Sequence, residues 1–431
     1  MKRLGSVLLW AVIAAAFIGP GTVATAASAG ASFGLALLWA LVFSTVACLV
    51  LQEAGGRLTI VSGLSLGQAL RSRYSTGVRG GFVVILVLGA ILIGCGAYEA
   101  GNILGGVAGA VMATGWSKGL LTLATGLIAA ALLWSQAPRR VARFLSGIVA
   151  VMGVAFLATA WRVGPSVVDV LRASFVPNLP LGSGVLVLGL IGTTVVPYNI
   201  FLGSGLARGQ NLQDLRLGLA IAVGFGGVIS MGVLVVGTAV EGAFSFEALA
   251  SVLSTKLGGW ASDLFAVGLL GAGLSSAITA PLAAAITARD LLGRGRDDEA
   301  WGMQSWRYRA VWMGVLGAGV GFGVSGIQPI PAIILAQALN GILLPLVAVF
   351  LFLAVNDRDL MAGQGNRLPA NLVMGAVVWV SLLLGTSALW RAVARVAGIS
   401  PPSPAQIVLL TTGLSLIVLF ALSRIFVRGR K

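Results

Sequence analysis

Two prolines interrupt long apolar runs of this sequence, and most of the uncharged polar residues that could do chemistry lie beside them. The first interruption falls at residues 19–22 (Gly-Pro-Gly-Thr) and the second at residues 196–199 (Val-Pro-Tyr-Asn). Proline removes a backbone donor and clashes with the preceding turn, and glycine resists helix formation. Inside a bilayer, a broken helix is tolerated only where its freed backbone groups meet protein, water or a ligand. We therefore expect both interruptions to be non-helical, to face each other near the bilayer midplane and to form a binding site.

Uncharged side chains around these interruptions could supply the ligands of that site. Together with freed backbone carbonyls, their oxygens could bind a cation directly or through water. Hydrogen bonding between helices is the alternative role for each of them, but their coincidence with both interruptions favours binding. Farther along the chain, Gln337 and Asn340 lie three residues apart on one helical face. The candidate substrate-binding residues are Thr22, Thr193, Thr194, Tyr198, Asn199, Gln337 and Asn340.

Glu99 is the one acid that falls well inside an apolar run. A carboxylate within the membrane is energetically expensive and usually marks an ion or proton path. The alternative is a packing role, in which the group is protonated or paired with a neighbouring polar residue. Other acids, such as Asp290, lie near the ends of apolar runs, where we expect solvent to reach them. The sequence has no histidine, so we expect Glu99 to be the proton-coupling or ion-path residue.

The elements that would position these residues are membrane-spanning helices. Of the 431 residues, 58% are hydrophobic and 10% are charged, whereas soluble domains carry about a quarter charged residues. A spanning helix needs about 20 apolar residues. We predict twelve spans, and surface helices within 163–180 and 241–257. The predicted spans are 7–29, 33–54, 81–110, 116–134, 141–161, 183–207, 215–240, 260–290, 309–327, 330–355, 370–389 and 405–427.

Positive charge gives the predicted topology. A net charge of +15 would suit nucleic-acid binding if it formed one patch, but most Lys and Arg lie in short loops between apolar runs. With the N-terminus inside, twenty-two of the 28 Lys and Arg fall on the inner side. We therefore expect no nucleic-acid partner and a protein of the lipid bilayer, in a bacterial plasma membrane, with both termini cytoplasmic. Cys48 and Cys95 lie in apolar runs, which predicts buried thiols rather than a disulfide.

The two interruptions also indicate internal symmetry. They fall in the first and sixth predicted spans, and an offset of five spans places the two copies in opposite orientations. This pattern is typical of the LeuT-type fold, in which two inverted five-helix repeats each begin with a broken helix. We predict an all-α polytopic membrane protein with a single transmembrane domain over 1–431: repeat one at 7–161, repeat two at 183–355 and additional spans at 370–427. Two unrelated proline kinks are the alternative explanation.

Several segments resemble the Nramp family of divalent-metal transporters. The most specific are AGASFGLALLW and LQEAGGRLTIVSG, in and after the first two predicted spans. Further resemblance lies in TTVVPYNIFLGSGL, FAVGLLGAGLSSAITAPLAA and ILAQALNGILLPLVAVFLF, so that it extends in order over residues 15–355. The resemblance implies a LeuT-type fold and proton-coupled uptake of manganese, iron or related divalent ions.

The resemblance also implies a metal site whose usual ligands differ here. Gly19 and Thr22 stand where the family has the acid and the amide of Asp-Pro-Gly-Asn. Val196 and Tyr198 stand where it has the thioether and the imidazole of Met-Pro-His. Gly19 and Val196 therefore join the candidate substrate-binding residues, and no metal ligand is assigned. A bare divalent ion that leaves water without a carboxylate to compensate would lose many kcal/mol.

Together these observations favour a secondary active transporter, not an enzyme, that uses no cofactor. Gln337 keeps a family position that can complete a metal site, and Glu99 keeps one of two acids usual in the third span. A hydrated divalent cation such as Mg²⁺, which dehydrates reluctantly, fits better than bare manganese or iron. One alternative is transport of a small organic solute, because the helix ends at the breaks can bind a carboxylate. The other is a non-transporting membrane sensor on the same fold.

Overall fold

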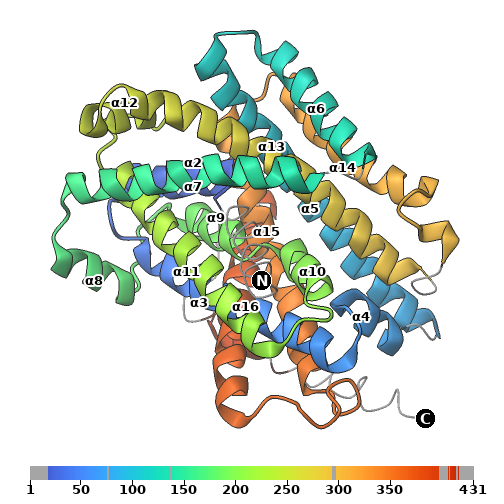
Figure 1. Ribbon diagram of the computed structural model, residues 1–431. Coiled ribbons are helices and arrows are strands. Elements are labelled where there is room, and N and C mark those ends of the chain that lie inside the picture. The colour runs from blue at the N-terminus through green and yellow to red at the C-terminus, as the bar shows by residue number, and fades with distance from the viewer. Residues whose placement is uncertain are drawn as a thin grey trace.

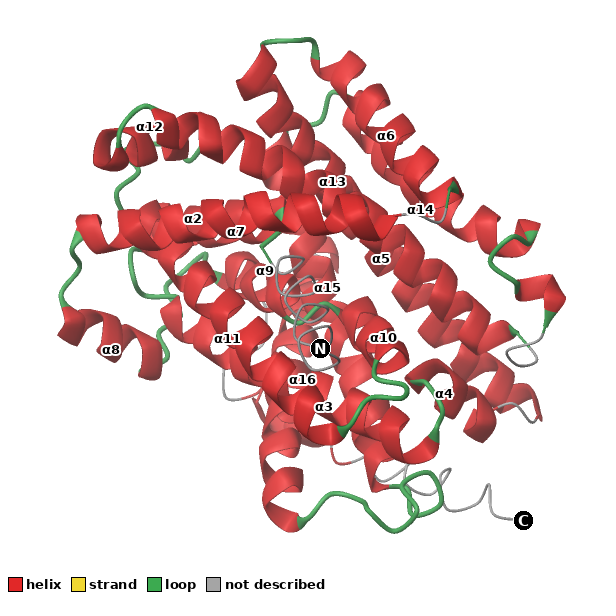
Figure 2. Cartoon of the chain, in the orientation of Figure 1, coloured by secondary structure: helices red, strands yellow, loops and turns green. Residues whose placement is uncertain are grey.

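The computed structural model describes residues 18–74, 77–135, 138–293, 298–397, 406, 408–413 and 416. Within these residues every regular element is a helix, and Figure 2 shows no strand. The helices, arranged as in Figure 1, are α2 (Pro20–Phe33), α3 (Leu38–Ser62), α4 (Leu66–Tyr74), α5 (Gly77–Thr114), α6 (Lys118–Trp134), α7 (Pro138–Val163), α8 (Val167–Phe175), α9 (Gly184–Thr194), α10 (Pro197–Leu206), α11 (Leu212–Gly237), α12 (Phe246–Leu257), α13 (Trp260–Leu292), η1 (Glu299–Trp301), α14 (Trp306–Val324), α15 (Pro329–Asn356) and α16 (Leu368–Ala397).

Eight spans in the described part of the chain are long and apolar enough to cross a membrane, with α9 and α10 together forming one of them. They coincide with eight of the twelve predicted spans. The helices α6 and α14, of 17 and 19 residues, occupy two more. The predicted span 7–29 is described only from residue 18, and 405–427 lies mostly outside the described residues. The surface helices predicted within 163–180 and 241–257 are α8 and α12.

Helical structure begins earlier after each interruption than the sequence predicts. Gly19 is extended, with φ −85° and ψ 172°, and α2 begins at the next residue. Val195 and Val196 separate α9 from α10, and α10 begins at Pro197. The prediction that 19–22 and 196–199 are non-helical throughout is therefore wrong, because α2 begins at Pro20 and α10 begins at Pro197. At the first helical position, the N–H that proline lacks would have no partner within the helix in any case.

Small residues allow the central helices to approach closely. Helices α5 and α13 run side by side in Figure 1. At their contact, a Cβ on Gly106 would lie 3.1 Å from the Cα of Gly273. Helices α9 and α15 also pack together, and a Cβ on Gly192 would overlap the backbone carbonyl of Gln337. Close backbone approach of this kind is the usual use of small residues between membrane helices. It brings the polar face of α15 beside the break between α9 and α10.

Candidate functional site

The two interrupted segments are in contact. The hydroxyl groups of Thr22 on α2 and Thr193 on α9 share a hydrogen bond, with 2.9 Å between the two Oγ1 atoms. Both side chains are buried. The first turns of α2 and α10 start at the interruptions, so the positive ends of two helix dipoles lie there. Pro197 has no N–H for the Thr193 carbonyl four residues earlier, which leaves that carbonyl free of an α-helical bond. We call this place, where the two interruptions meet, the junction.

Gln337 of α15 completes the junction. Its side chain is fully buried and lies against the first turn of α2, where a Cβ on Gly21 would overlap its amide. Within the described residues, neither Oε1 nor Nε2 has a hydrogen-bond partner. A buried polar group without a partner costs about 1–3 kcal/mol. This amide therefore offers one acceptor and one donor group to a ligand at the junction.

Three further candidates lie in or beside the second interruption but have other neighbours. The Thr194 hydroxyl donates to the Leu190 carbonyl at 2.9 Å, within its own helix. The Tyr198 ring packs edge-on against Tyr98 of α5, with ring centroids 5.3 Å apart. Asn199 is buried in the first turn of α10. None of these contacts crosses the junction, whereas the hydrogen bond across it joins Thr22 and Thr193.

Asn340 and Gln337 share a helix but face different neighbours. The Asn340 Nδ2 donates to the Ala336 carbonyl at 3.1 Å. Its Oδ1 is turned toward α5, where a Cβ on Gly94 would lie 2.9 Å away. The structure therefore brings Gln337 to the interruptions and directs Asn340 along α5. Three residues on a helix span about 300°, so two such positions diverge by about 60°, and of the two only Gln337 also reaches α2.

Glu99 is fully buried, but it points away from Gln337. A Cβ on Gly319 of α14 would lie 2.6 Å from the Glu99 Cγ. The carboxyl Oε2 accepts a hydrogen bond from Asn102 Nδ2 at 3.2 Å. The other oxygen, Oε1, has no partner among the described residues. The acid thus lies on the α14 side of α5, whereas Gly101 on the same helix faces the Gln337 amide, since a Cβ on Gly101 would lie 3.6 Å from Nε2.

The donor groups at the junction are neutral. Across residues 18–416, apart from the gaps in the description, no group of three or more His, Cys, Asp or Glu could hold a metal ion. Hydroxyls, an amide and a freed carbonyl remain. Oxygen donors suit hard cations such as Mg²⁺, which keep several water molecules, whereas thioether and thiolate ligands suit softer metals.

Some residues of these clusters are absent from the sequence-based candidates. Asn102 follows Glu99 by three residues, a spacing that places two side chains on one helical face and could have revealed the pair. The contacts of Tyr98 and Gly21 are tertiary and carry no comparable signal. The expectation that solvent reaches Asp290 is wrong. Asp290 is buried where the end of α13 packs against the start of α4, and its Oδ2 accepts a hydrogen bond from Ser65 Oγ at 2.6 Å.

The chain is similar in sequence to a family of membrane transporters. A family model described as "Natural resistance-associated macrophage protein-like" (Nramp) matches residues 10–391. The chain is 28% identical over 412 residues to the divalent metal cation transporter MntH of Deinococcus radiodurans, covering 91% of each chain. It is 28% identical over 399 residues to MntH of Mycobacterium leprae, covering 86% of this chain and 88% of that one.

Solved structures share the fold. The Eremococcus coleocola manganese transporter, in complex with an aromatic bis-isothiourea substituted compound, matches with a TM-score of 0.72 at 20% identity, over 99% of this chain and 94% of that one. Mhp1, a nucleobase-cation-symport-1 family transporter in a closed conformation with bromovinylhydantoin bound, matches with a TM-score of 0.60 at 14% identity, over 98% and 92%. The predicted all-α membrane fold of LeuT type is confirmed.

Proposed function

Because the chain belongs to the natural resistance-associated macrophage protein-like (Nramp) family, we propose that it is a secondary transporter of a divalent metal cation. Relatives that cover most of the chain carry the name divalent metal cation transporter. The observation that carries the proposal is the Gln337 amide, fully buried beside the first turn of α2 and the break between α9 and α10, with neither polar atom partnered among the described residues. A buried group of this kind is retained at a stability cost, which a bound substrate offsets.

We further propose that the cation binds with part of its water shell. The groups at the junction that could coordinate a cation are the hydroxyls of Thr22 and Thr193, the Gln337 amide and the freed Thr193 carbonyl. None is negatively charged, so a bare divalent ion would not recover its hydration free energy there. Hydrated Mg²⁺ needs only oxygen acceptors for its water molecules and fits this set. Bare manganese or iron, which softer ligands would favour, fits it less well.

Glu99 is the proposed coupling residue. Its carboxyl has one oxygen bonded to Asn102 and one without a partner in the described chain, so it can hold a proton without losing its hydrogen bond. It lies on α5, whose other face contacts the junction through Gly101. A change in the position of α5 would therefore reach both the acid and the substrate. Burial at 0% exposure makes the charged form of such a group costly in lipid.

Calorimetric titration of the purified protein tests the proposal. We expect Mg²⁺ to bind and Mn²⁺ or Cd²⁺ to bind no more tightly, and micromolar binding of Mn²⁺ or Cd²⁺ to the unmodified protein would contradict the hydrated-cation site. The converse variant combines Gly19→Asp, Thr22→Asn and Val196→Met and should gain Mn²⁺ affinity. Gly19 is extended at the N-cap of α2, a position that favours Asp. A control with Gly19→Asn, Thr22→Asn and Val196→Leu matches the shape without the charge and the thioether.

The same amide favours a second candidate, a small organic solute with an amide or carboxylate group. The Gln337 side chain presents a donor and an acceptor together, and the N-terminal ends of α2 and α10 attract a negative group. The same calorimetric titration separates the two candidates. If an organic solute binds and divalent cations neither bind nor compete with it, the substrate is the organic solute and not the cation.

A further inference from the structure

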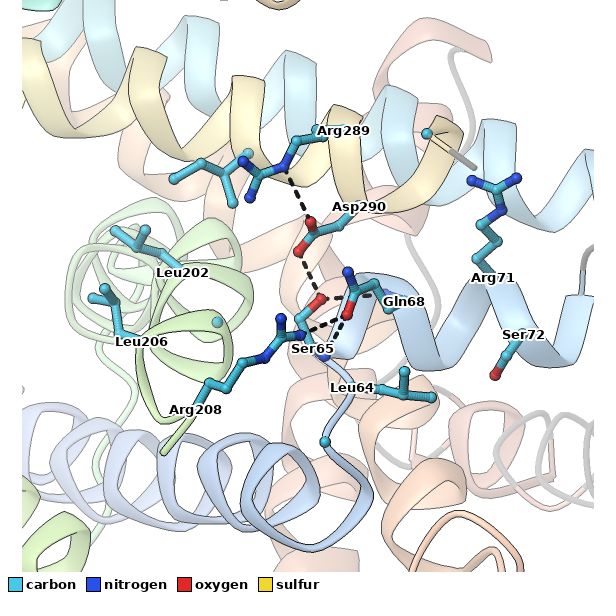
Figure 3. A pocket seen from close by; sticks show the side chains of 14 residues that line it. Leu64, Ser65, Gln68, Arg71, Ser72, Leu202, Leu206, Arg208, Arg289 and Asp290 are labelled. Atoms are coloured by element: carbon cyan, nitrogen blue, oxygen red, sulfur yellow. Dashed lines mark hydrogen bonds and ion pairs between the residues drawn. The ribbon is translucent and has the colours of Figure 1, made fainter. Parts of the chain in front are cut away.

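A second polar region lies at the far end of α10 from the junction. A cavity of about 590 Å³ opens between the α3–α4 turn, α4 and the last turns of α10 and α13. Helix α10 has 10 residues and is about 15 Å long, and only its second half, from Leu202 onward, lines the cavity, whereas the interruption lies before its first residue. Leu202 and Leu206 form an apolar wall, and Figure 3 shows polar side chains converging from the other elements.

A hydrogen-bonded network crosses the middle of this cavity. Ser65 and Gln68 form a capping box at the start of α4, with Gln68 N donating to Ser65 Oγ at 3.3 Å and Ser65 N donating to Gln68 Oε1 at 3.2 Å. Each then reaches a second element. Ser65 Oγ donates to Asp290 Oδ2 at 2.6 Å, and Arg208 Nη2 donates to Gln68 Oε1 at 2.7 Å (Figure 3). The network fixes α4 to α13 and to the segment after α10.

Arg71 stands outside this network. Its Nη1 is buried and has no hydrogen-bond partner within the described residues, and in Figure 3 no dashed line reaches its guanidinium group. Arg289 pairs with Asp290, with 3.5 Å between Nε and Oδ1. Arginines near helix ends often bond to the last carbonyls, but the Arg71 Nη1 makes no such bond to the described chain. Three arginines and one acid line the cavity, so its net charge is positive.

We propose that this cavity binds a small multivalent oxyanion, of phosphate or carboxylate chemistry, with Arg71 as its principal contact. A guanidinium group binds such oxygens through two parallel hydrogen bonds, and it does so more strongly where water is partly excluded. The volume of about 590 Å³ lies within the range of small-molecule sites and exceeds what a chloride ion fills. The same positive charge disfavours a divalent cation here, so this is a separate site from the junction.

Thermal unfolding of the purified full-length protein tests the proposal, with pyrophosphate as the probe in metal-free buffer at ionic strength held constant with sodium chloride. We expect saturable stabilisation by pyrophosphate. Arg71→Gln should raise the apparent Kd for pyrophosphate about tenfold or more, since a hydrogen bond to a charged group is lost. The matched control is Arg172→Gln, on the exposed surface of α8, which should leave the Kd unchanged. Arg71→Lys keeps the charge but loses the two parallel N–H donors of the guanidinium group, so its apparent Kd should lie between those of the other two variants.

A second arm separates a soluble anion from a lipid headgroup of the same chemistry. The protein is placed in nanodiscs of phosphatidylcholine with or without phosphatidylglycerol, and its unfolding is compared with that of Arg71→Gln. Stabilisation by pyrophosphate that depends on Arg71 identifies a soluble ligand, and stabilisation by phosphatidylglycerol alone that depends on Arg71 identifies a headgroup. If neither probe stabilises the protein, or if both proteins respond equally, the oxyanion site is refuted.

Discussion

Helix α5 separates two buried polar clusters, one made of neutral side chains and one that contains a carboxyl group. On one side lies the junction, where Thr22, Thr193 and Gln337 are all neutral. On the other side, against α14, Glu99 is paired with Asn102. Both clusters leave buried polar atoms without partners among the described residues, yet only one can carry charge. Under the proposed function, substrate contact and proton coupling are divided between two faces of one helix, rather than combined at one set of ligands.

The two clusters are also held differently. At the junction, the backbone of α9 lies directly on the backbone of α15 at Gly192, with no side chain between them. At Glu99, a Cβ on Gly319 would meet the side-chain Cγ first, at 2.6 Å, and the backbone carbonyl oxygen only at 3.0 Å. Backbone contacts cannot adjust to added volume, whereas a side chain can turn. Mutations should therefore harm the first cluster through folding and the second through titration.

The largest expected effect comes from Gly192→Ala. The added Cβ would overlap the Gln337 carbonyl and lie 2.5 Å from the Gly341 nitrogen, so the two helices must separate. Overpacking of this kind costs about 1–3 kcal/mol and sometimes more. We expect a clear fall in melting temperature by fluorescence-detected size exclusion. The control Gly96→Ala, on α5 with nothing within 4 Å of the new Cβ, should melt no lower than the original, and equal melting of both variants would contradict the backbone contact.

Next in size is Gln337→Leu, which separates stability from function at the junction. Replacing an unpartnered buried amide by an apolar group of similar size is nearly neutral or stabilising. We expect an unchanged or higher melting temperature together with loss of substrate binding, measured by calorimetry. A merely structural role would give the opposite pattern, lower stability with binding retained.

Glu99→Gln tests the acidic cluster. The amide keeps the shape and the capacity to hydrogen-bond Asn102 but cannot titrate. We expect a folded protein whose transport either stops or loses its dependence on pH in proteoliposomes. The control Glu247→Gln removes an exposed carboxyl from α12 and should keep the original pH profile. An unchanged flux and pH profile in Glu99→Gln would return Glu99 to a packing role.

The smallest effect is expected from Thr22→Val, which removes the hydroxyl that bonds to Thr193. A neutral hydrogen bond contributes about 0.5–1.5 kcal/mol, so the free energy of unfolding should fall by about that amount. Thr22→Ser keeps the hydroxyl and should restore most of it. If both variants unfold alike, the hydrogen bond between the interruptions is not what joins them.

Local chemistry made much of this architecture predictable. Pro20 and Pro197 mark the interruptions because proline acts on its own turn, and Glu99 is buried because its whole neighbourhood is apolar. Cys48 and Cys95 are buried free thiols, as predicted. The length of each interruption was not predictable in the same way, since proline is compatible both with a break and with a first helical turn.

The sequence could not predict the neighbours of the buried polar side chains, because these depend on which helices pack together. The spacing of Gln337 and Asn340 indicates a common face, but only tertiary packing sends one to Gly21 and the other to Gly94. The burial of Asp290 likewise depends on Ser65, more than two hundred residues earlier in the chain. Orientation in the membrane and the division into repeats remain predictions from the charge distribution and from the spacing of the prolines.

Flux measured in proteoliposomes is the direct test of transport through the junction. With Mg²⁺, Mn²⁺ and Cd²⁺ offered separately and in competition, we expect uptake of Mg²⁺ that depends on Gln337 and is only weakly inhibited by Mn²⁺ or Cd²⁺. Uptake of Mn²⁺ at micromolar concentration, unaffected by excess Mg²⁺, would contradict a site built from neutral oxygens, and so would the absence of any divalent flux.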